Sequence, residues 1–203
     1  MKPSNSSNSV SKHCAIEMDV SKLFSVNNAL QSVMEQYKKP PCIVVNAAGI
    51  ASSNFFLDLK ENDYDSVTAV NLKGTYLVTQ IFAQAIVAAS IPGSIINISS
   101  IVGVYGGKGI THYASTKAGV IGLSKSAAKE LGGTNVRVNA VLPGYIITPM
   151  TDTLPDEVRE TMIKLIALGR LGEPAEIAEV IAFLASDKSS YITGATIEVS
   201  GGY

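Results

Sequence analysis

Residues 94–131 read SIINISSIVGVYGGKGITHYASTKAGVIGLSKSAAKEL, an apolar run followed by a longer stretch of small and apolar residues. The run SIINIS is rich in β-branched residues, which is typical of a buried strand. The stretch 112–131 has the length and composition of a helix, and Gly132-Gly133 ends it before the next apolar run. A buried strand followed by a covering helix is the repeating unit of parallel sheets.

The same alternation extends over the rest of the chain. It predicts an α/β fold in which a parallel sheet is covered by helices on both faces. We expect one domain over residues 13–203, preceded by a polar, disordered leader over residues 1–12. The predicted strands are residues 13–20, 42–47, 94–99, 136–141 and 196–199. The predicted helices are residues 22–38, 61–90, 112–131, 155–167 and 174–186.

Composition narrows the classes of function. The chain has 203 residues, is 46% hydrophobic and carries a net charge of −1. Near-neutral charge argues against electrostatic binding to nucleic acid or to an anionic membrane. The uncharged stretch between Lys73 and Lys108 is interrupted by Gln80, Pro92 and Asn97, so a buried helix, a turn and a buried strand explain it better than a membrane span.

Cysteine and histidine usage predicts neither a disulfide framework nor a metal site. Cys14 and Cys42 are the only cysteines, and no His or Cys cluster has the spacing of metal ligands. We expect two reduced thiols and a reducing compartment. The N-terminal sequence has neither the apolar segment of a secretory signal nor the arginines of a mitochondrial presequence.

Four polar residues stand out against apolar surroundings. Tyr113 and Lys117 are four residues apart in the predicted helix 112–131 and therefore lie on one face of it. The neighbours of Lys117 are uncharged and mostly small, so this lysine needs either an exit to water or a local function. Ser100 follows a predicted strand, at the edge where open α/β sheets bind ligands. Asn71 lies in VNLKGTYLV, where a buried amide needs a partner.

Each residue also has a structural explanation. A Tyr–Lys pair occurs on many amphipathic helices, and Asn71 alone is equally well explained as a buried amide. Ser99 competes with Ser100, although alternation along the strand points the two side chains in opposite directions. The combination of the four residues, rather than any one of them, favours a catalytic site.

Five ordered motifs resemble those of the short-chain dehydrogenase/reductase family. They are Asn46-Ala47-Ala48-Gly49, Asn71 in VNLKG, Ser100 in NISSIVG, Tyr113-x-x-x-Lys117, and Pro143-Gly144 followed by Thr148. The resemblance runs from about residue 13 to the C-terminus. It is greatest to the bacterial-type 3-oxoacyl-acyl-carrier-protein reductases and the type 8 17β-hydroxysteroid dehydrogenases. It implies a Rossmann-like doubly wound sheet and hydride transfer between a nicotinamide cofactor and a carbonyl or secondary alcohol.

The resemblance assigns a role to each of the four residues. Tyr113 is expected to exchange a proton with the substrate oxygen, and the Lys117 ammonium is expected to lower the tyrosine pKa towards neutrality. Lys117 also binds the nicotinamide ribose in such a site, and Tyr113 is expected to contact the cofactor as well. Ser100 donates to the carbonyl oxygen of the substrate. Asn71 anchors a water that relays protons between Lys117 and solvent.

Further cofactor contacts are implied by the resemblance alone. Asp19 and Val20 are implied to contact the adenine, and Asn46 the adenosine ribose. The nicotinamide carboxamide is implied to be contacted by Ile146, Ile147 and Thr148. NAD(H) is favoured over NADP(H). Residues 150–168 correspond to a mobile substrate lid.

The family's opening strand, glycine-rich TGxxxGxG turn and helix have no counterpart here, nor do its second strand and helix. The turn that would cradle the cofactor pyrophosphate is therefore expected to be missing. In the strand order 3-2-1-4-5-6, the two missing strands separate residues 13–20 from residues 42–47 by roughly 10 Å. Either these segments pair directly, or 42–47 becomes a bare apolar edge in a less stable protein, or the sequence is an incomplete gene product.

Two functions remain open from the sequence. The first is an oxidoreductase of 3-oxoacyl thioesters or related carbonyls such as steroid ketones, in fatty-acid or steroid metabolism. The second is a non-catalytic subunit that acts through association, because helices 74–90 and 112–131 resemble those that pair in the family's oligomers. We expect a tetramer, either of this chain or with a related subunit. The resemblance favours the mitochondrial matrix, with the cytoplasm as the alternative.

Overall fold

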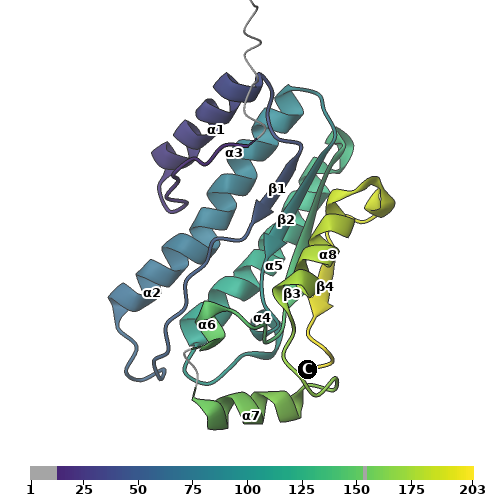
Figure 1. The fold of residues 1–203 in the computed structure, drawn as a ribbon. Helices are drawn as coiled ribbons and strands as arrows, with labels where there is room; N and C mark the ends of the chain where they lie inside the picture. Colours follow the sequence, from purple (N-terminus) through teal and green to yellow (C-terminus); the bar gives the residue numbers. More distant parts are fainter. Residues whose placement is uncertain (1–12, 153–154) are drawn as a thin grey trace, which may run out of the picture.

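The computed structural model describes residues 13–152 and 155–203, so the predicted leader lies outside the described residues. Four parallel strands form one sheet in the order β1-β2-β3-β4 (Figure 1). Their bounds are Ile43–Asn46, Gly93–Ile98, Val136–Pro143 and Thr196–Val199. The carboxyl ends of all four strands therefore lie along one edge of the sheet. The predicted α/β fold with a parallel sheet is confirmed.

Helices cover both faces of this sheet. On one face, α3 and α5 pack against the strands, and α1 packs against α3. On the other face, α8 packs against β2 and β3. The longer helices are α1 (Leu23–Tyr37), α2 (Glu61–Thr68), α3 (Thr75–Ala88), α5 (Thr111–Leu131), α7 (Asp156–Leu165) and α8 (Pro174–Ala185). Two short helices, α4 (Val102–Tyr105) and α6 (Pro149–Asp152), follow the carboxyl ends of β2 and β3.

The helix predicted over residues 61–90 is interrupted. A π-helical turn, η1 (Ala69–Gly74), separates α2 from α3, and both Asn71 and Gly74 are buried in it. π-helical turns are rare and often accompany functional residues. Together α3 and β2 account for the long uncharged stretch, and no helix in the described part of the chain is long and apolar enough to cross a membrane.

The strand predicted over residues 13–20 is wrong. This segment has no regular structure, and Met18 and Val20 pack against the core formed by α1, α3 and the sheet. A Cβ atom at Gly74 would lie 2.7 Å from Val20 Cγ2, so the segment packs closely on η1. Direct pairing with β1 is wrong as well. The apolar side chains of the segment pack against helices, and no strand in the described part of the chain lies beside them to supply hydrogen bonds.

β1 is an edge strand with one uncovered face, which confirms the prediction of an apolar edge. Val44 and Asn46 are buried beneath α3, whereas Ile43 and Val45 are 46% and 41% exposed. Val45 lies beside Ile96, which α8 covers, but the cover does not extend to β1. An exposed apolar edge of this kind promotes pairing with other chains.

We expect Val45→Lys to reduce self-association of the chain, because a charge on an edge strand opposes strand pairing. The free energy of unfolding should change by no more than about 0.5 kcal/mol, since the side chain is partly exposed. Light scattering at increasing protein concentration and urea denaturation measure the two effects. Val44→Lys is the matched control, because Val44 faces the core and its replacement should unfold the chain. Equal aggregation of the wild type and Val45→Lys would contradict the prediction.

Candidate active site

Ser100, Tyr113 and Lys117 converge at the carboxyl end of β2. The Lys117 ammonium donates to the Ile98 carbonyl oxygen at 2.9 Å and lies 5.5 Å from the centre of the Tyr113 ring. Ser100 and Tyr113 share a side-chain hydrogen bond. Both Tyr113 and Lys117 belong to α5, where their four-residue spacing puts them on the face towards β2. The predicted grouping of these three residues agrees with this geometry.

Two residues that the sequence analysis did not assign to the site hold Lys117 in place. The Ser99 hydroxyl is buried and donates to the backbone carbonyl of Lys117 at 2.7 Å. A Cβ atom at Gly103 would lie 2.8 Å from the backbone nitrogen of Ala118, so only glycine allows α4 to pack this closely on α5. Ser100 is partly exposed beside Tyr113. The choice of Ser100 over Ser99 as the substrate-facing serine is consistent with this arrangement.

Asn71 links η1 to the loop that follows β1. Its amide accepts from the Ile50 backbone N–H and donates to the Ile50 carbonyl, both at 2.9 Å. A Cβ atom at Gly49 would lie 3.5 Å from Asn71 Oδ1 and 3.7 Å from Lys117 Nζ, so both polar atoms border the same small space. The buried Asn71 amide therefore has a hydrogen-bond partner, the Ile50 backbone, as predicted from its apolar surroundings. The water relay through Asn71 stays a prediction.

Burial dominates the electrostatics of the site. It lowers the pKa of Lys117 to about 8, because the ammonium has lost most of its water. Burial also raises the pKa of Tyr113, and the hydrogen bond with Ser100 offsets only part of that rise. The expectation that Lys117 lowers the Tyr113 pKa is therefore wrong for this state of the site. The ammonium contacts the Ile98 carbonyl, and the loss of water around the phenol has the larger effect.

The residues predicted to contact the cofactor are distributed over three regions. The Asn46 side chain points into the protein, where its amide donates to Thr79 Oγ1 and Asn97 Oδ1 at 3.0 and 2.7 Å. Asn97 donates in turn to Ser124. This buried amide network joins β1 and β2 to α3 and α5, and the sequence analysis missed Asn97. The backbone of Asn46 is the part of the residue that remains at the carboxyl edge.

Ile146, Ile147 and Thr148 lie just beyond the carboxyl end of β3, which is consistent with their predicted place near the nicotinamide. The Ile147 N–H donates to the Gly172 carbonyl at 2.9 Å, and the Thr148 N–H donates to Thr151 Oγ1 at 3.0 Å. Asp19 and Val20, in contrast, precede α1 in a turn, where the Asp19 carboxylate accepts from Ser21. They do not end a strand, so the premise for their adenine contact is wrong.

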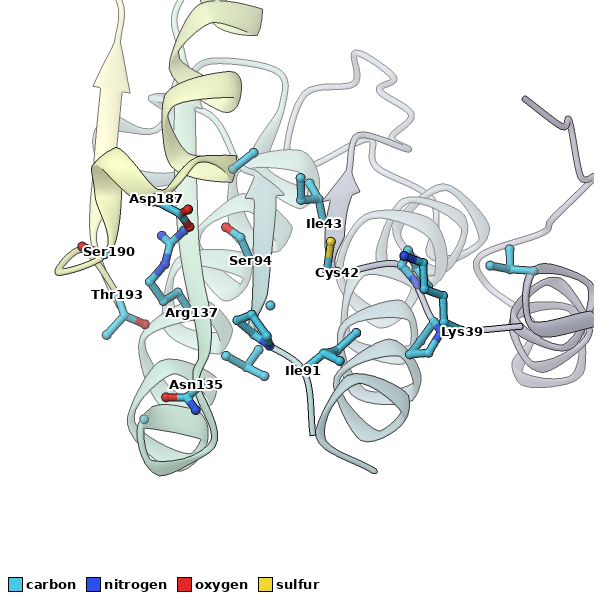
Figure 2. Close-up of a pocket in the computed structure, with 18 of the residues that line it drawn as sticks. Lys39, Cys42, Ile43, Ile91, Ser94, Asn135, Arg137, Asp187, Ser190 and Thr193 are labelled. Atoms are coloured by element: carbon cyan, nitrogen blue, oxygen red, sulfur yellow. The ribbon is translucent and has the colours of Figure 1, made fainter. Parts of the chain in front are cut away.

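A cavity lies at the opposite edge of the sheet, where β1, β2 and β3 begin (Figure 2). Its volume is about 910 Å³, and Lys39, Cys42, Ser94 and Arg137 are among its lining residues. The Arg137 guanidinium donates to the carbonyl oxygens of Leu184, Ser186 and Ile192 and is thereby occupied. This cavity is separate from the catalytic residues. Within the described residues, no group of three His, Cys, Asp or Glu side chains could hold a metal ion.

Comparison with known proteins identifies the family. Residues 3–203 match the short-chain dehydrogenase/reductase model described as "Enoyl-(Acyl carrier protein) reductase". The chain belongs to the short-chain dehydrogenase/reductase family. As a member of this family it is an oxidoreductase that uses a nicotinamide cofactor.

Three curated relatives illustrate the similarity. The (3R)-3-hydroxyacyl-CoA dehydrogenase of Mus musculus is 52% identical over 191 residues, which cover 94% of this chain and 74% of the mouse protein. The 3-oxoacyl-[acyl-carrier-protein] reductase FabG of Thermotoga maritima is 49% identical over 177 residues, or 87% of this chain and 71% of FabG. Estradiol 17-beta-dehydrogenase 8 of Callithrix jacchus is 57% identical over 134 residues, or 66% of this chain and 100% of that protein.

The surroundings of Lys117 fit the ribose end of a nicotinamide cofactor. Among the described residues, Lys117 Nζ donates to one acceptor, the Ile98 carbonyl, so two of its three N–H groups remain available. Lys117 is only 5% exposed, and a buried cation of this kind favours hydroxyl acceptors in the space beside Gly49. Ribose hydroxyls have that chemistry.

We expect Gly103→Ala to destabilise the short-chain dehydrogenase/reductase fold by about 1–3 kcal/mol, because the added Cβ meets the backbone of α5. Activity should fall as well, since α4 and Lys117 move apart. Gly122→Ala is the matched control on α5: its Cβ would meet nothing within 4 Å, so it should stabilise the helix by about 0.5–1 kcal/mol. Urea denaturation measures both variants, and equal stabilities would show that α4 adapts to the extra atom.

We expect Lys117→Met to stabilise the cofactor-free chain at pH 7 by up to about 3 kcal/mol. The pKa of Lys117 is about 8 when folded and 10.5 in its ordinary state, so the unfolded chain binds this proton more tightly in that interval. In the wild type, the Lys117 contribution therefore makes the free energy of unfolding rise with pH above 8.

The measurement is urea denaturation of both proteins at several pH values between 7 and 9.5. Lys117→Met should remove the rise, because it has no titrating group. Lys125→Met, on the exposed side of the same helix, is the control and should retain the rise. A wild-type stability that does not increase above pH 8 relative to Lys117→Met would refute the assignment.

Proposed function

We propose that this protein interconverts 3-oxoacyl and 3-hydroxyacyl thioesters, using NAD(H). The observation that carries the proposal is the convergence of Ser100, Tyr113 and Lys117 at the carboxyl end of β2. The substrate class is supported by the names of two relatives near 50% identity, a 3-hydroxyacyl-CoA dehydrogenase and a 3-oxoacyl-[acyl-carrier-protein] reductase. The preference for NAD(H) over NADP(H) stays a prediction.

The chain's own residues perform the proton chemistry of the proposed reaction. A carbonyl oxygen gains negative charge as its carbon is reduced, so it needs hydrogen-bond donors and then a proton. Ser100 and Tyr113 share a hydrogen bond and supply two hydroxyl groups to that oxygen, and Tyr113 transfers the proton. The bound nicotinamide cofactor supplies or accepts the hydride.

Lys117 has two roles in this scheme. Its free N–H groups orient the ribose of the cofactor, and its positive charge favours the tyrosinate that remains when Tyr113 has given up its proton. The structure shows that burial alone raises the Tyr113 pKa. In the reductive direction the developing alkoxide takes the Tyr113 proton, and in the oxidative direction Tyr113 must first lose its proton, which the Lys117 charge favours.

A steroid alcohol is the second candidate substrate. It is favoured by the similarity to estradiol 17-beta-dehydrogenase 8 over 134 residues. Both candidates need the same proton transfer, so they differ only in the residues that contact the substrate beyond the reacting carbon. Kinetics with acetoacetyl-CoA and with estradiol on one preparation would separate them.

We also propose that α3 and α5 form the contact between subunits of a tetramer, of this chain or with a related one. Support comes from the outward faces of these helices, which carry Tyr76 on α3 and Ser115 and Ala118 on α5. Small exposed residues allow close approach of another helix, and a tyrosine adds contact area. A subunit that acts only through association would use this same surface.

Tyr113→Phe should reduce kcat/KM for acetoacetyl-CoA by about 10²–10⁴-fold, because it removes the transferred proton and keeps the ring. NADH oxidation measures the rate, and NADH should still bind, because the ring is kept. Tyr64→Phe is the control, since Tyr64 is exposed on α2 away from the three residues. A wild-type chain that neither binds NADH nor reduces acetoacetyl-CoA would instead support the association-only function.

A further inference from the structure

The substrate lid is attached to the protein mainly at its two ends. Helices α6 and α7 follow the carboxyl end of β3, and the chain returns to the body of the protein at Ile166. No described residue of α7 is fully buried, so the helix packs only shallowly on the rest of the protein. The first end is held by the Ile147 and Thr148 hydrogen bonds. The orientation of the lid therefore depends on how its second end is held.

The last residues of the chain hold that second end. The N–H groups of Ala167 and Leu168 donate to the carbonyl oxygens of Gly202 and Gly201, at 3.2 and 3.0 Å. In Figure 1 the C-terminus accordingly lies near α7. Ile166 is buried against this contact, because a Cβ atom at Gly201 would lie 2.8 Å from Ile166 Cγ2.

The two glycines have backbone conformations that other residues rarely adopt. Gly201 and Gly202 have φ angles of 70° and 82°. A Cβ atom at Gly202 would also lie 2.8 Å from Ala167 Cβ. Glycine at positions 201 and 202 therefore allows the backbone to pack closely on the end of the lid. We call Gly201-Gly202-Tyr203 the C-terminal clamp.

Tyr203 connects the clamp to the catalytic end of the sheet. Its ring lies 5.5 Å from the ring of Tyr145, edge to face, and 6.1 Å from the ring of Tyr105. Tyr145 follows β3 at the first end of the lid, and Tyr105 ends α4. Burial raises the pKa of Tyr145 to about 12, and the neighbouring Tyr203 adds to this rise.

The same contacts reach the catalytic serine. α4 begins two residues after Ser100, and the Tyr203 ring packs against the cluster of Ile101 and Val102. Tyr113 packs against that cluster too. The Tyr203 side chain thus contacts the segment after Ser100 and the first end of the lid, and the two residues before it, Gly201 and Gly202, bind the second end through their carbonyl oxygens.

We propose that Tyr203 is a positioning residue for the substrate: it fixes the lid relative to Ser100 and Tyr113 and thereby sets the affinity for the acyl chain. Its effect on the lid is a property of this chain alone, whereas its effect on the substrate rests on the proposed function. Loss of the Tyr203 ring frees the second end of the lid and leaves the proton-transfer residues in place.

Hydrogen exchange of the whole cofactor-free chain tests the first half of this proposal. In Tyr203→Ala, the amides of Ala167 and Leu168 should exchange about tenfold faster, the free-energy equivalent of one aromatic contact. Amides of α5 should be unchanged. Tyr203→Phe keeps the ring and should restore slow exchange. Tyr191→Ala is the matched control, because Tyr191 is fully exposed near the same end of the chain.

Steady-state kinetics with acetoacetyl-CoA and NADH test the second half. Tyr203→Ala should raise KM for the thioester about tenfold, with kcat within about twofold of the wild type and NADH affinity unchanged. Tyr203→Phe should restore KM. A purely structural role would instead lower the amount of folded enzyme and leave KM as it was.

The outcomes separate the two proposals. Unchanged exchange at Ala167 and Leu168 in Tyr203→Ala, or faster exchange throughout the chain, overturns the clamp. Faster local exchange with a lower kcat and an unchanged KM overturns the role in substrate positioning. A wild type without activity, combined with the local change in exchange, supports the clamp and refutes the proposed function.

Discussion

The buried ammonium of Lys117 is the constraint on which the carboxyl end of the sheet depends. Removing this charge from water is unfavourable, as its lowered pKa shows, so neighbouring groups must hold it there. The Ile98 carbonyl binds the ammonium, the Ser99 hydroxyl binds the backbone of Lys117, and Gly103 brings α4 into contact with α5. These contacts join β2, α4 and α5 into one unit, and Ser100 lies inside it.

Local sequence patterns predicted most of the fold correctly, but the strand that they predicted over residues 13–20 is wrong. Four strands and the helices around them follow from β-branched runs that alternate with helical stretches, because each of these elements finds the neighbours it requires. Residues 13–20 have the same pattern but no strand beside them, so their side chains pack on α1 and η1 instead. A run of apolar residues specifies burial, and whether that burial produces a strand depends on distant parts of the chain.

Some residues of the candidate site could likewise be found from local sequence patterns, and others could not. Ser100, Tyr113 and Lys117 could be found because their spacing is recognisable in the sequence alone. Ser99, Asn97 and Gly103 could not, since each acts on an atom of another element that only packing brings near. The pKa of Tyr113 is raised, whereas the sequence predicted that it would be lowered, and the reason is related. The separation of the two side chains was predictable, but the water removed from around the phenol was not.

The π-helical turn at Ala69–Gly74 has a consequence for how the chain tolerates changes in length. A π turn holds one residue more than an α-helical turn, so deleting a single residue there would convert the segment to continuous α-helix. Because the wider turn absorbs the additional residue, α2 and α3 would keep nearly the same rotational relation, whereas the residues inside the turn would change position. Asn71 could no longer reach Ile50, although no apolar side chain had been lost. At this point in the fold, one additional residue in a turn determines where the side chain of Asn71 lies, while the helices on either side keep their packing.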